Sequence, residues 1–357
     1  MTSKNLFLFY GARTLIVLFW LGVIFAFLFS PKVANIFRKE RSITVFTLPL
    51  LLDAKYLKEF EKETGIKVYL TYYETNEELY GKLKSTRGAG YDILIPSDYI
   101  VSALIKDGLI KKIDKSKLNF FDRLEPAVTS QYHDPNNDYT LPYFWTVYGL
   151  GINKNYFGGK TPPPTWGLVF KKDMSPGRIS MTNAPREAIM FAAHYLFGSI
   201  NALKDPKKIK KIKELLIKQK EWVQVYTEAR VKELLMSGAC PVAVALAADV
   251  WRVKEEDNTD NIVFVVPKGG TFAVIDSFAV SSETEKDDLI YEFFNYFYRK
   301  PVVKHHLHEY GSYSPVIDVK LTGNLHCALP EGERYIFFRP IVPEKVIEDI
   351  WIDLMAS

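Results

Sequence analysis

Short, apolar, β-rich runs alternate with amphipathic helices along the first part of the chain, and this alternation constrains the fold more than any other feature. The runs cover residues 43–48, 66–72 and 93–95. Between them, Asp53 is placed to cap a helix that ends at Gly65, and Thr75 with Glu78 forms a capping box for a second helix. Ser97 stands where a third helix begins. Short strands that alternate with helices predict a parallel sheet covered by helices.

The same alternation resumes in the second half of the chain. A helix is expected at 186–197, a strand at 241–246, and a turn at 268–270 between two further strands. Three late helices are expected at 287–298, 301–310 and 343–355. At 357 residues the chain is long enough for about two domains. We therefore expect an α/β fold of two units, with ligand bound where strand ends and helix N-termini face a crevice.

The amino terminus has the pattern of an export signal. An unbroken apolar run at residues 15–29 follows basic residues, and no small-x-small cleavage site stands out. The run is slightly shorter than the ~17 residues that a membrane-spanning helix needs. Residues 1–41 are therefore expected to be a signal peptide or signal anchor plus a linker. In an oxidising compartment Cys240 and Cys327 could pair, but two cysteines are too few for a disulfide framework, and the pairing stays open.

The charge of the chain excludes one class of function. Lysine and arginine exceed aspartate and glutamate by only four, which is too few for nucleic-acid binding without a clustered basic face. The most basic segment, residues 204–220, places Ile209, Ile212 and Leu216 on one stripe, so its lysines form the outer face of an amphipathic helix. This face is either simply solvated or docks on a transporter or an anionic membrane surface.

No catalytic or cofactor motif is present. The sequence has no GxSxG, HExxH, P-loop or GxGxxG pattern, and Gly149-Leu150-Gly151, just before an expected crossing strand, lacks the third glycine of a dinucleotide fingerprint. Three histidines cluster late in the chain, at His305, His306 and His308. No third metal ligand is identifiable beside the two that share a helix face, and histidines near a helix C-terminus are usually solvated or favoured by the dipole. We expect no catalytic residue, metal or cofactor.

Four stretches of the chain resemble one protein family. They are YETNEELYGKLK at 73–84, YDILIPSDYIVSALIKDGLIKKIDKSKL at 91–118, DPNNDYTLPYFWTVYGLGIN at 134–153 and VPKGGTFAVIDSFAV at 266–280. In these stretches the chain is similar to the periplasmic spermidine/putrescine-binding proteins of polyamine ABC transporters. The resemblance implies a periplasmic-binding-protein-like fold, in which two α/β lobes are joined by hinge strands. Lobe one would hold residues 42–149 and 277–318, and lobe two would hold residues 150–276 and 319–357.

The resemblance also implies a set of ligand-binding residues. Ser97 and Tyr99 stand in the family's PS-x-Y motif, and Glu187 ends a segment similar to its TDDARE. Asp276 stands where the family has the aspartate of WMDS, and Tyr313 corresponds, within one residue, to a late tyrosine. A polyamine needs carboxylates at its amines and rings along its methylenes, each ring adding about 0.5–2 kcal/mol. Asp276 and Glu187 would neutralise the amines. Tyr99 and Tyr313 would line the chain, and Ser97 would hydrogen-bond the ligand as well as cap its helix.

Other ligand positions of the family are not kept. Its first-strand loop reads like NWTEY, whereas residues 47–51 lack the tryptophan, the glutamate and the tyrosine. Ala184 replaces an aspartate, and Leu246 and Val274 replace two tryptophans. If each lost ring removes about 1 kcal/mol, affinity for a polyamine falls by roughly two orders of magnitude, and the lost acids weaken it further.

Three functions are compatible with these residues. The first is the periplasmic substrate-binding component of an ABC importer for polyamines, a monomer that binds putrescine or spermidine in the interlobe cleft and delivers it to the membrane permease. Residues 14–30 would anchor it to the inner membrane if the leader is not cut. The second keeps the scaffold for a different, less cationic solute, with an apolar set lining the cleft at Leu48, Leu50, Leu246 and Val274. The third is a membrane-tethered interaction protein with a vestigial cleft.

Overall fold

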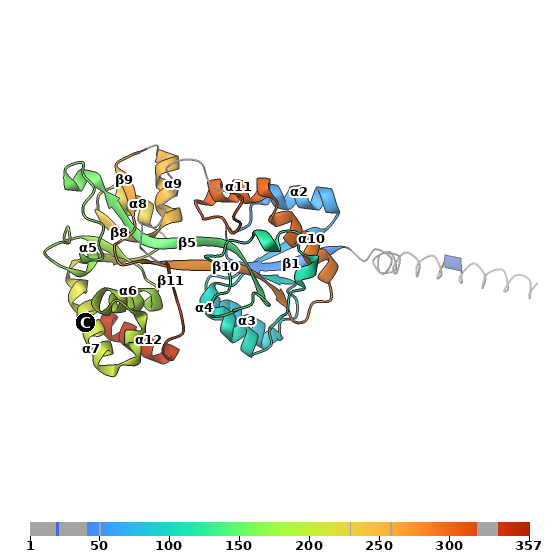
Figure 1. The fold of residues 1–357 in the computed structure, drawn as a ribbon, viewed down its shortest axis with the longest axis horizontal. Coiled ribbons are helices and arrows are strands. Elements are labelled where there is room, and N and C mark those ends of the chain that lie inside the picture. Colours follow the sequence, from blue (N-terminus) through green and yellow to red (C-terminus); the bar gives the residue numbers. More distant parts are fainter. Residues whose placement is uncertain (1–18, 21–40, 50, 229, 258, 320–334) are drawn as a thin grey trace, which may run out of the picture.

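The computed structural model describes residues 19–20, 41–49, 51–228, 230–257, 259–319 and 335–357. Its helices and strands form two lobes joined by two long strands, β5 (Thr140–Asn153) and β10 (Thr271–Ser281), as Figure 1 shows. The expected α/β class and its division into two lobes are therefore confirmed.

Some expectations concern residues outside this description. They are the leader within residues 1–41, Leu50, and Cys327. Cys240 is fully buried, and its pairing with Cys327 stays an open expectation. Within the described part of the chain, no helix has the length and apolar character that crossing a membrane requires.

Lobe one is a mixed sheet flanked by helices. Its strands are β1 (Ser42–Thr47), β2 (Lys67–Tyr72), β3 (Ile93–Leu94) and β4 (Ile110–Lys111), and its helices are α2 (Ala54–Thr64), α3 (Asn76–Thr86), α4 (Asp98–Lys106), α10 (Asp287–Phe297) and α11 (Lys300–Tyr310). β1 pairs in parallel with both β2 and β3, whereas β10 runs antiparallel to β3 and β4, so the expected parallel sheet is confirmed only for β1, β2 and β3. The expected caps are present. Asp53 accepts a bond at the start of α2, Gly65 ends that helix with a φ of 69°, and Thr75 accepts from the N–H of Glu78.

Lobe two repeats this arrangement. Its strands are β6 (Ile179–Met181), β7 (Val223–Tyr226), β8 (Val242–Leu246), β9 (Ile262–Val265) and β11 (Tyr335–Phe337), and its helices are α5 (Gly167–Phe170), α6 (Pro185–Phe197), α7 (Pro206–Gln219), α8 (Val231–Met236), α9 (Ala247–Asp257) and α12 (Glu344–Ala356). β6 pairs in parallel with β7 and β8. Five 3-10 turns, at Lys115–Lys117, Phe121–Arg123, Lys154–Phe157, Ile200–Lys204 and Lys220–Trp222, complete the described elements.

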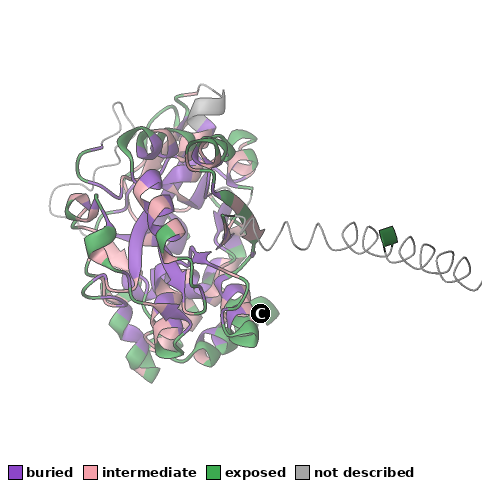
Figure 2. Ribbon diagram, turned by 90° about the vertical axis from the view of Figure 1, so that its right-hand side faces the viewer, coloured by how far each residue is buried: buried purple, intermediate pink, exposed green. Residues whose placement is uncertain are grey.

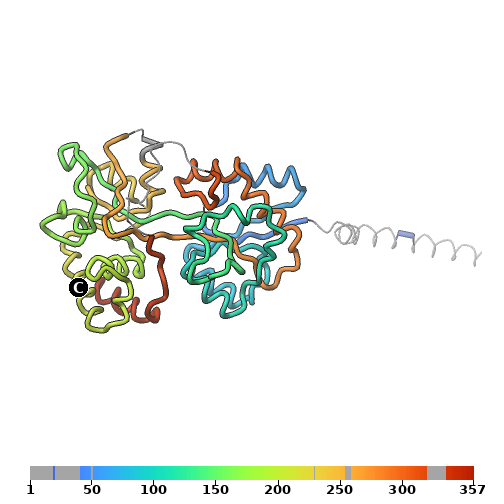
Figure 3. Tube along the Cα trace, viewed as in Figure 1, coloured from blue at the N-terminus to red at the C-terminus, as the bar shows by residue number. Residues whose placement is uncertain are grey.

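The waist between the lobes consists of two crossing strands with one bridging residue on each side. β5 and β10 run side by side from one lobe into the other (Figure 3). They are antiparallel, with Asp276 opposite Phe144 and a bulge after Asp276. On the outer edge of β10, Ser97 bridges to Asp276, and on the outer edge of β5, Tyr313 bridges to Trp145. The waist therefore brings together four segments that are far apart in the sequence.

The two glycines at 149 and 151 have a packing role. They lie inside the crossing strand β5, whereas the sequence pattern placed them just before it. A Cβ on Gly149 would stand 2.6 Å from the carbonyl oxygen of Val265, and one on Gly151 would stand 2.7 Å from a methyl of Leu235. The glycines let β9 and α8 approach the strand closely, which explains them without a nucleotide.

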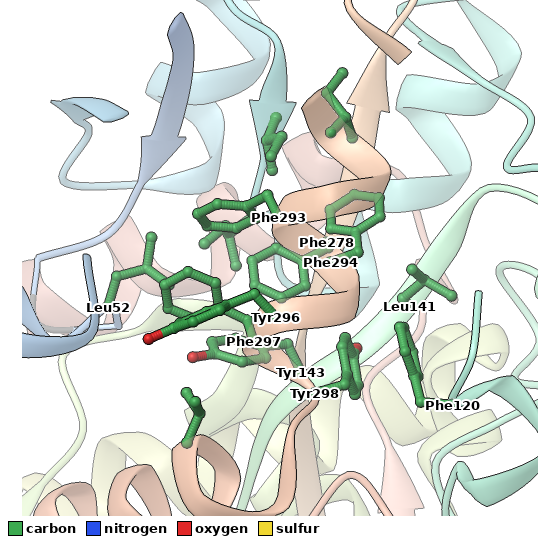
Figure 4. Packing of buried hydrophobic residues seen from close by; sticks show 14 of the residues in the cluster. Leu52, Phe120, Leu141, Tyr143, Phe278, Phe293, Phe294, Tyr296, Phe297 and Tyr298 are labelled. Atoms are coloured by element: carbon green, nitrogen blue, oxygen red, sulfur yellow. The ribbon is translucent and has the colours of Figure 1, made fainter. Parts of the chain in front are cut away.

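Each lobe has its own hydrophobic core. Figure 4 shows the core of lobe one, where Phe278 of β10 faces Phe293, Phe294 and Phe297 of α10. In lobe two, α6, α7 and α12 close over β6 and β8. Buried residues follow the central strands, whereas exposed ones lie on the outer faces of the helices (Figure 2). The stripe of α7 fits this pattern, since Ile212 and Leu216 are buried and most of its lysines are exposed.

The histidine cluster is structural in part. His306 is buried, and its Nδ1 lies 3.0 Å from the hydroxyl of Tyr143. The expectation of a solvated side chain is therefore wrong for His306, because α11 turns it into the core of lobe one. Burial lowers the pKa of His306 to about 4, so the ring is neutral at physiological pH. His305 lies 3.0 Å from Asp53 and ties α11 to the start of α2.

Candidate functional site

Ser97 and Asp276 meet at the waist. Ser97 Oγ donates a hydrogen bond to Asp276 Oδ1 at 2.6 Å, and both residues are buried. Ser97 makes no side-chain capping bond to α4. The expected capping role is therefore wrong. The hydroxyl serves a carboxylate that lies 179 positions away in the sequence.

Asn76, the first residue of α3, holds this serine in place. Its Nδ2 donates to Ser97 Oγ at 2.9 Å, and its Oδ1 accepts from Ser97 N at 3.0 Å. None of the described cationic side chains forms an ion pair with Asp276. Neutral groups thus orient the carboxylate of Asp276 and leave its charge uncompensated.

Lobe two contributes the start of α6. Pro185 occupies the first turn, where its fixed φ suits a helix start, and Arg186 and Glu187 follow it. The guanidinium of Arg186 lies 4.8 Å from the ring centroid of Tyr99, which belongs to α4 of lobe one. Arg186 also forms an ion pair with Glu344 of α12. The lobes are therefore in contact along a surface where α4 meets α6, which we call the interlobe seam.

Acidic side chains face Tyr99 from both lobes. The hydroxyl of Tyr99 donates to Oε1 of Glu77 on α3 at 3.3 Å. Burial raises the pKa of Tyr99, and the negative charges of Glu77 and Glu187 raise it further. The tyrosine therefore stays neutral and presents a ring and a hydroxyl between carboxylates of the two lobes.

Glu228 extends the acidic group in lobe two. Its Oε1 accepts hydrogen bonds from Thr182 Oγ1 at 2.6 Å and from the hydroxyl of Tyr148 at 3.0 Å. Its charge acts on Glu187, which is only partly exposed. No local pattern in the sequence indicates a role for Glu228. Asn76 and Glu77 could have been found, because they lie in the first turn after the cap Thr75, and helix N-termini were expected to face the crevice.

Tyr313 lies in a different group of contacts. Its backbone N–H donates to Trp145 O at 2.8 Å, and its ring centroid is 4.7 Å from that of Trp145. Trp145 pairs with Ile275, the neighbour of Asp276, and successive side chains of a strand point to opposite faces. The structure thus brings together Ser97, Tyr99, Glu187 and Asp276, and places Tyr313 across β5 from them.

The positions that differ from the family's ligand set pack against the cores. Leu48 is partly buried against the core of lobe one, and Leu246 and Val274 are partly buried against the core of lobe two. Ala184 precedes α6, and its N–H donates to Thr182 Oγ1 at 3.0 Å. The side chains at these four positions therefore provide no polar group for a solute, and the polar groups of the seam come from other residues.

A cavity of about 350 Å³ opens elsewhere, in lobe two. It is lined in part by Arg178, Arg230, Gln224 and Thr227. Two arginines make this cavity unsuited to a cation, so it does not compete with the seam as a site for an amine.

Comparison with known proteins decides the family. A model described as bacterial extracellular solute-binding protein matches residues 55–322. The chain belongs to this family.

Relatives of this solute-binding protein have consistent names. The putrescine-binding periplasmic protein PotF of Escherichia coli is 30% identical over 301 residues, which are 80% of this chain and 81% of the relative. The spermidine/putrescine-binding periplasmic protein of Salmonella typhimurium is 32% identical over 248 residues, 70% of each chain. A spermidine/putrescine ABC transporter substrate-binding protein, PotD of Streptococcus pneumoniae, has the same fold, with a TM-score of 0.77, 21% identity, and coverage of 88% of this chain and 99% of its own.

The acids of this solute-binding protein have shifted pKa values. Burial raises the pKa of Asp276 to about 6, although the hydrogen bond from Ser97 opposes the shift. Burial and then the charge of Glu228 raise the pKa of Glu187 to about 7. Burial is the main cause of both shifts, so a cation placed beside these acids would favour their ionised forms.

We expect the affinity for a cationic solute to depend on pH. Between about pH 7.5 and about pH 5.5 it should fall roughly 10- to 100-fold, because a cation needs carboxylates that are ionised and protons then compete with it. The stability of the protein without solute should depend on pH in the opposite direction from the affinity. The folded chain binds more protons than the unfolded chain, so these two acids contribute stability at low pH that is lost as pH rises through about 6 and 7.

Calorimetric titration in two buffers of different ionisation enthalpy measures both quantities. We expect solute binding near neutral pH to release protons, and the release should shrink in the Asp276→Asn variant. A dissociation constant that is constant over this pH range, without proton release, would contradict the shifts.

Proposed function

We propose that this protein is the substrate-binding component of an ABC importer for polyamines, and that it takes putrescine or spermidine. The names of its relatives support this proposal, because they are putrescine- and spermidine/putrescine-binding periplasmic proteins. The names of the same relatives also support a periplasmic location. We further propose that the protein is a monomer that delivers its solute to a membrane permease, with residues 14–30 as an anchor if the leader is retained.

The observation that carries the proposal is the pairing of acids across the seam. Asp276 is held at the waist by Ser97, Glu187 projects from the start of α6 in lobe two, and Tyr99 lies beside Glu187. An ammonium group at each acid would be charge-assisted in a buried setting, and the methylenes would lie against the ring. Tyr313, packed on Trp145, is left as a weaker candidate for ring contact.

Lobe closure follows from the same arrangement. Carboxylates of both lobes converge at the seam, so a dication bound between them stabilises the closed arrangement relative to an open one. Without solute, repulsion between the acids favours separation of the lobes. The closed form would present both lobes together to the permease.

Arg186 lies beside these acids and carries a positive charge, which would repel a cationic solute if it were not compensated. Its ion pair with Glu344 and its stacking on Tyr99 compensate its charge locally. Arg186 therefore acts as a brace between the lobes in this proposal, and it does not supply a binding group for an anionic solute.

Calorimetric titration of the full-length chain tests the function. We expect putrescine or spermidine to bind with a dissociation constant of about 1 μM or tighter, because a buried and a partly buried acid can each contribute a charge-assisted contact. 1-Butylamine, with one ammonium group, is the matched control and should bind much more weakly. Heat from neither polyamine, with well-folded protein at two temperatures, would overturn the proposal.

Two aliphatic side chains favour a second candidate function, which is the binding of a less cationic solute. Leu246 and Val274 stand where the family has rings, and both are partly exposed. A less cationic solute would suit such a surface. Mass spectrometry of the solute released from purified protein distinguishes the two, because recovery of only putrescine or spermidine would exclude the second candidate.

A further inference from the structure

Asp98 is a buried acid that the comparison with family motifs did not single out. It is the first residue of α4, between Ser97 and Tyr99, and its exposed fraction is 0%. Among the described residues, neither of its carboxylate oxygens has a hydrogen-bond partner of good geometry. The backbone N–H groups of Tyr99 and of Asp98 itself lie near enough to favour its charge, but they do not offset the effect of burial.

The surroundings of Asp98 belong to the interlobe seam. Burial raises the pKa of Asp98 well above its usual value, and the charges of Asp276 at the waist and Glu187 in lobe two raise it further. The hydroxyl of Tyr132 is also buried without a partner among the described residues, and Asp98 acts on it. Asp98 therefore lies in the same polar group as the two acids already assigned to the solute, and it adds to their repulsion.

Other buried aspartates of this chain show what a structural role looks like. Asp92 accepts from Thr44 N, Thr284 Oγ1 and Lys286 Nζ, at 2.6–2.9 Å. Asp134 accepts from three backbone N–H groups and the hydroxyl of Thr140, at 2.8–2.9 Å. Both carboxylates are buried, and both accept several hydrogen bonds. Asp98 is equally buried, but its carboxylate accepts no such set of hydrogen bonds from the described residues.

Helix stabilisation does not account for Asp98. An acid in the first turn of a helix gains only a small stabilisation from the helix dipole, whereas burying a carboxylate without a partner destabilises the fold much more. A residue that only favoured the helix would be more stable with its carboxylate in water. Helix stabilisation therefore does not explain the position, and the charges of two further acids act on it.

We propose that Asp98 is a third solute-binding carboxylate, which holds an ammonium group in the seam together with Asp276 and Glu187. This inference rests on the proposed function. The carboxylate of Asp98 supplies a negative charge at the interlobe seam. Ala184 and residues 47–51, where the family has acids, carry no acidic side chain in this chain. Three acids around one solute favour a molecule with two or more ammonium groups over a monoamine.

The Asp98→Asn variant of the full-length chain tests the inference with two measurements. We expect its affinity for putrescine and spermidine to fall roughly 30-fold or more, because one partner of a buried charge pair is lost. We expect the melting temperature without solute to be unchanged or higher, because the amide removes an uncompensated charge. The Asp98→Glu variant keeps the charge and should recover part of the affinity.

Asp92→Asn is the matched control. Its partners include Lys286, so it should lower the melting temperature and leave polyamine affinity within about threefold of the wild type. Wild-type affinity in Asp98→Asn would overturn the inference and leave the proposed function standing, and a lower melting temperature without loss of affinity would do the same. A wild-type chain that binds neither polyamine would overturn the proposed function, and the inference with it.

Discussion

Replacing Asp276 by asparagine should weaken putrescine binding by roughly 30-fold to several thousand-fold, which corresponds to about 2–5 kcal/mol. Asparagine has nearly the same shape and can still accept the hydrogen bond that Ser97 Oγ makes at 2.6 Å. The substitution therefore removes the negative charge and leaves the waist in place. The loss is large because Asp276 is buried, so water cannot replace the missing charge next to an ammonium group.

Two comparisons separate this effect from misfolding. Asp173→Asn changes an exposed aspartate of lobe two and should leave the dissociation constant unchanged. The melting temperature of Asp276→Asn without solute should be equal to or above that of the wild type, because burial already disfavours the ionised carboxylate. A dissociation constant equal to that of the wild type would show that Asp276 does not bind the solute.

Replacing Phe278 by alanine should lower the free energy of unfolding by about 3–5 kcal/mol. The ring is completely buried, and its centroid lies 4.2 Å from that of Tyr143 and 5.3 Å from that of Phe294. Figure 4 shows it among the rings that α10 lays against the waist strands. These neighbours cannot all move inward, so a cavity remains and adds to the lost transfer free energy.

Denaturant unfolding monitored by circular dichroism measures this change. Tyr69→Ala is the control, because Tyr69 is an aromatic residue of the same lobe that is 49% exposed, and its loss should alter the free energy by about 0.5 kcal/mol or less. Equal effects of the two substitutions would contradict the packing described for lobe one. Because Phe278 lies two residues from Asp276 on β10, the same strand supports both the core and the site.

The local elements of the fold could be predicted because their causes lie within a few residues. Asp53 caps α2 by accepting from a neighbour two positions on, Gly65 ends it with a positive φ, and Thr75 accepts from a residue three positions on. The strands of each lobe are short, and their existence and the parallel pairing of β1 with β2 and of β6 with β8 followed from the alternation with helices. The antiparallel pairing with the crossing strands β5 and β10 did not follow from it. Gly149 was harder to interpret, because its neighbour Val265 is far away in the sequence.

The site was predictable only in part. Similarity to family motifs identifies which residues are candidates for binding the solute, but it does not show which side chains those residues contact. Ser97 was assigned to a helix cap, yet its hydroxyl is engaged by Asn76 and Asp276. Glu228 is brought beside Glu187 by the packing of lobe two, and nothing near it in the sequence indicates that. The contacts of Ser97 and Glu228 therefore could not be predicted from the residues next to them in the sequence.

By itself the sequence determined the helices, the strands, the two α/β units and the residue types available for binding a cation, because periodicity, caps and turn residues act over short distances. Only the tertiary structure decided which carboxylates share the seam, which ones are neutralised by partners and which, like Asp98, are buried with none. Burial and charge interactions depend on distances between segments that are far apart in the chain, and folding alone brings those segments together.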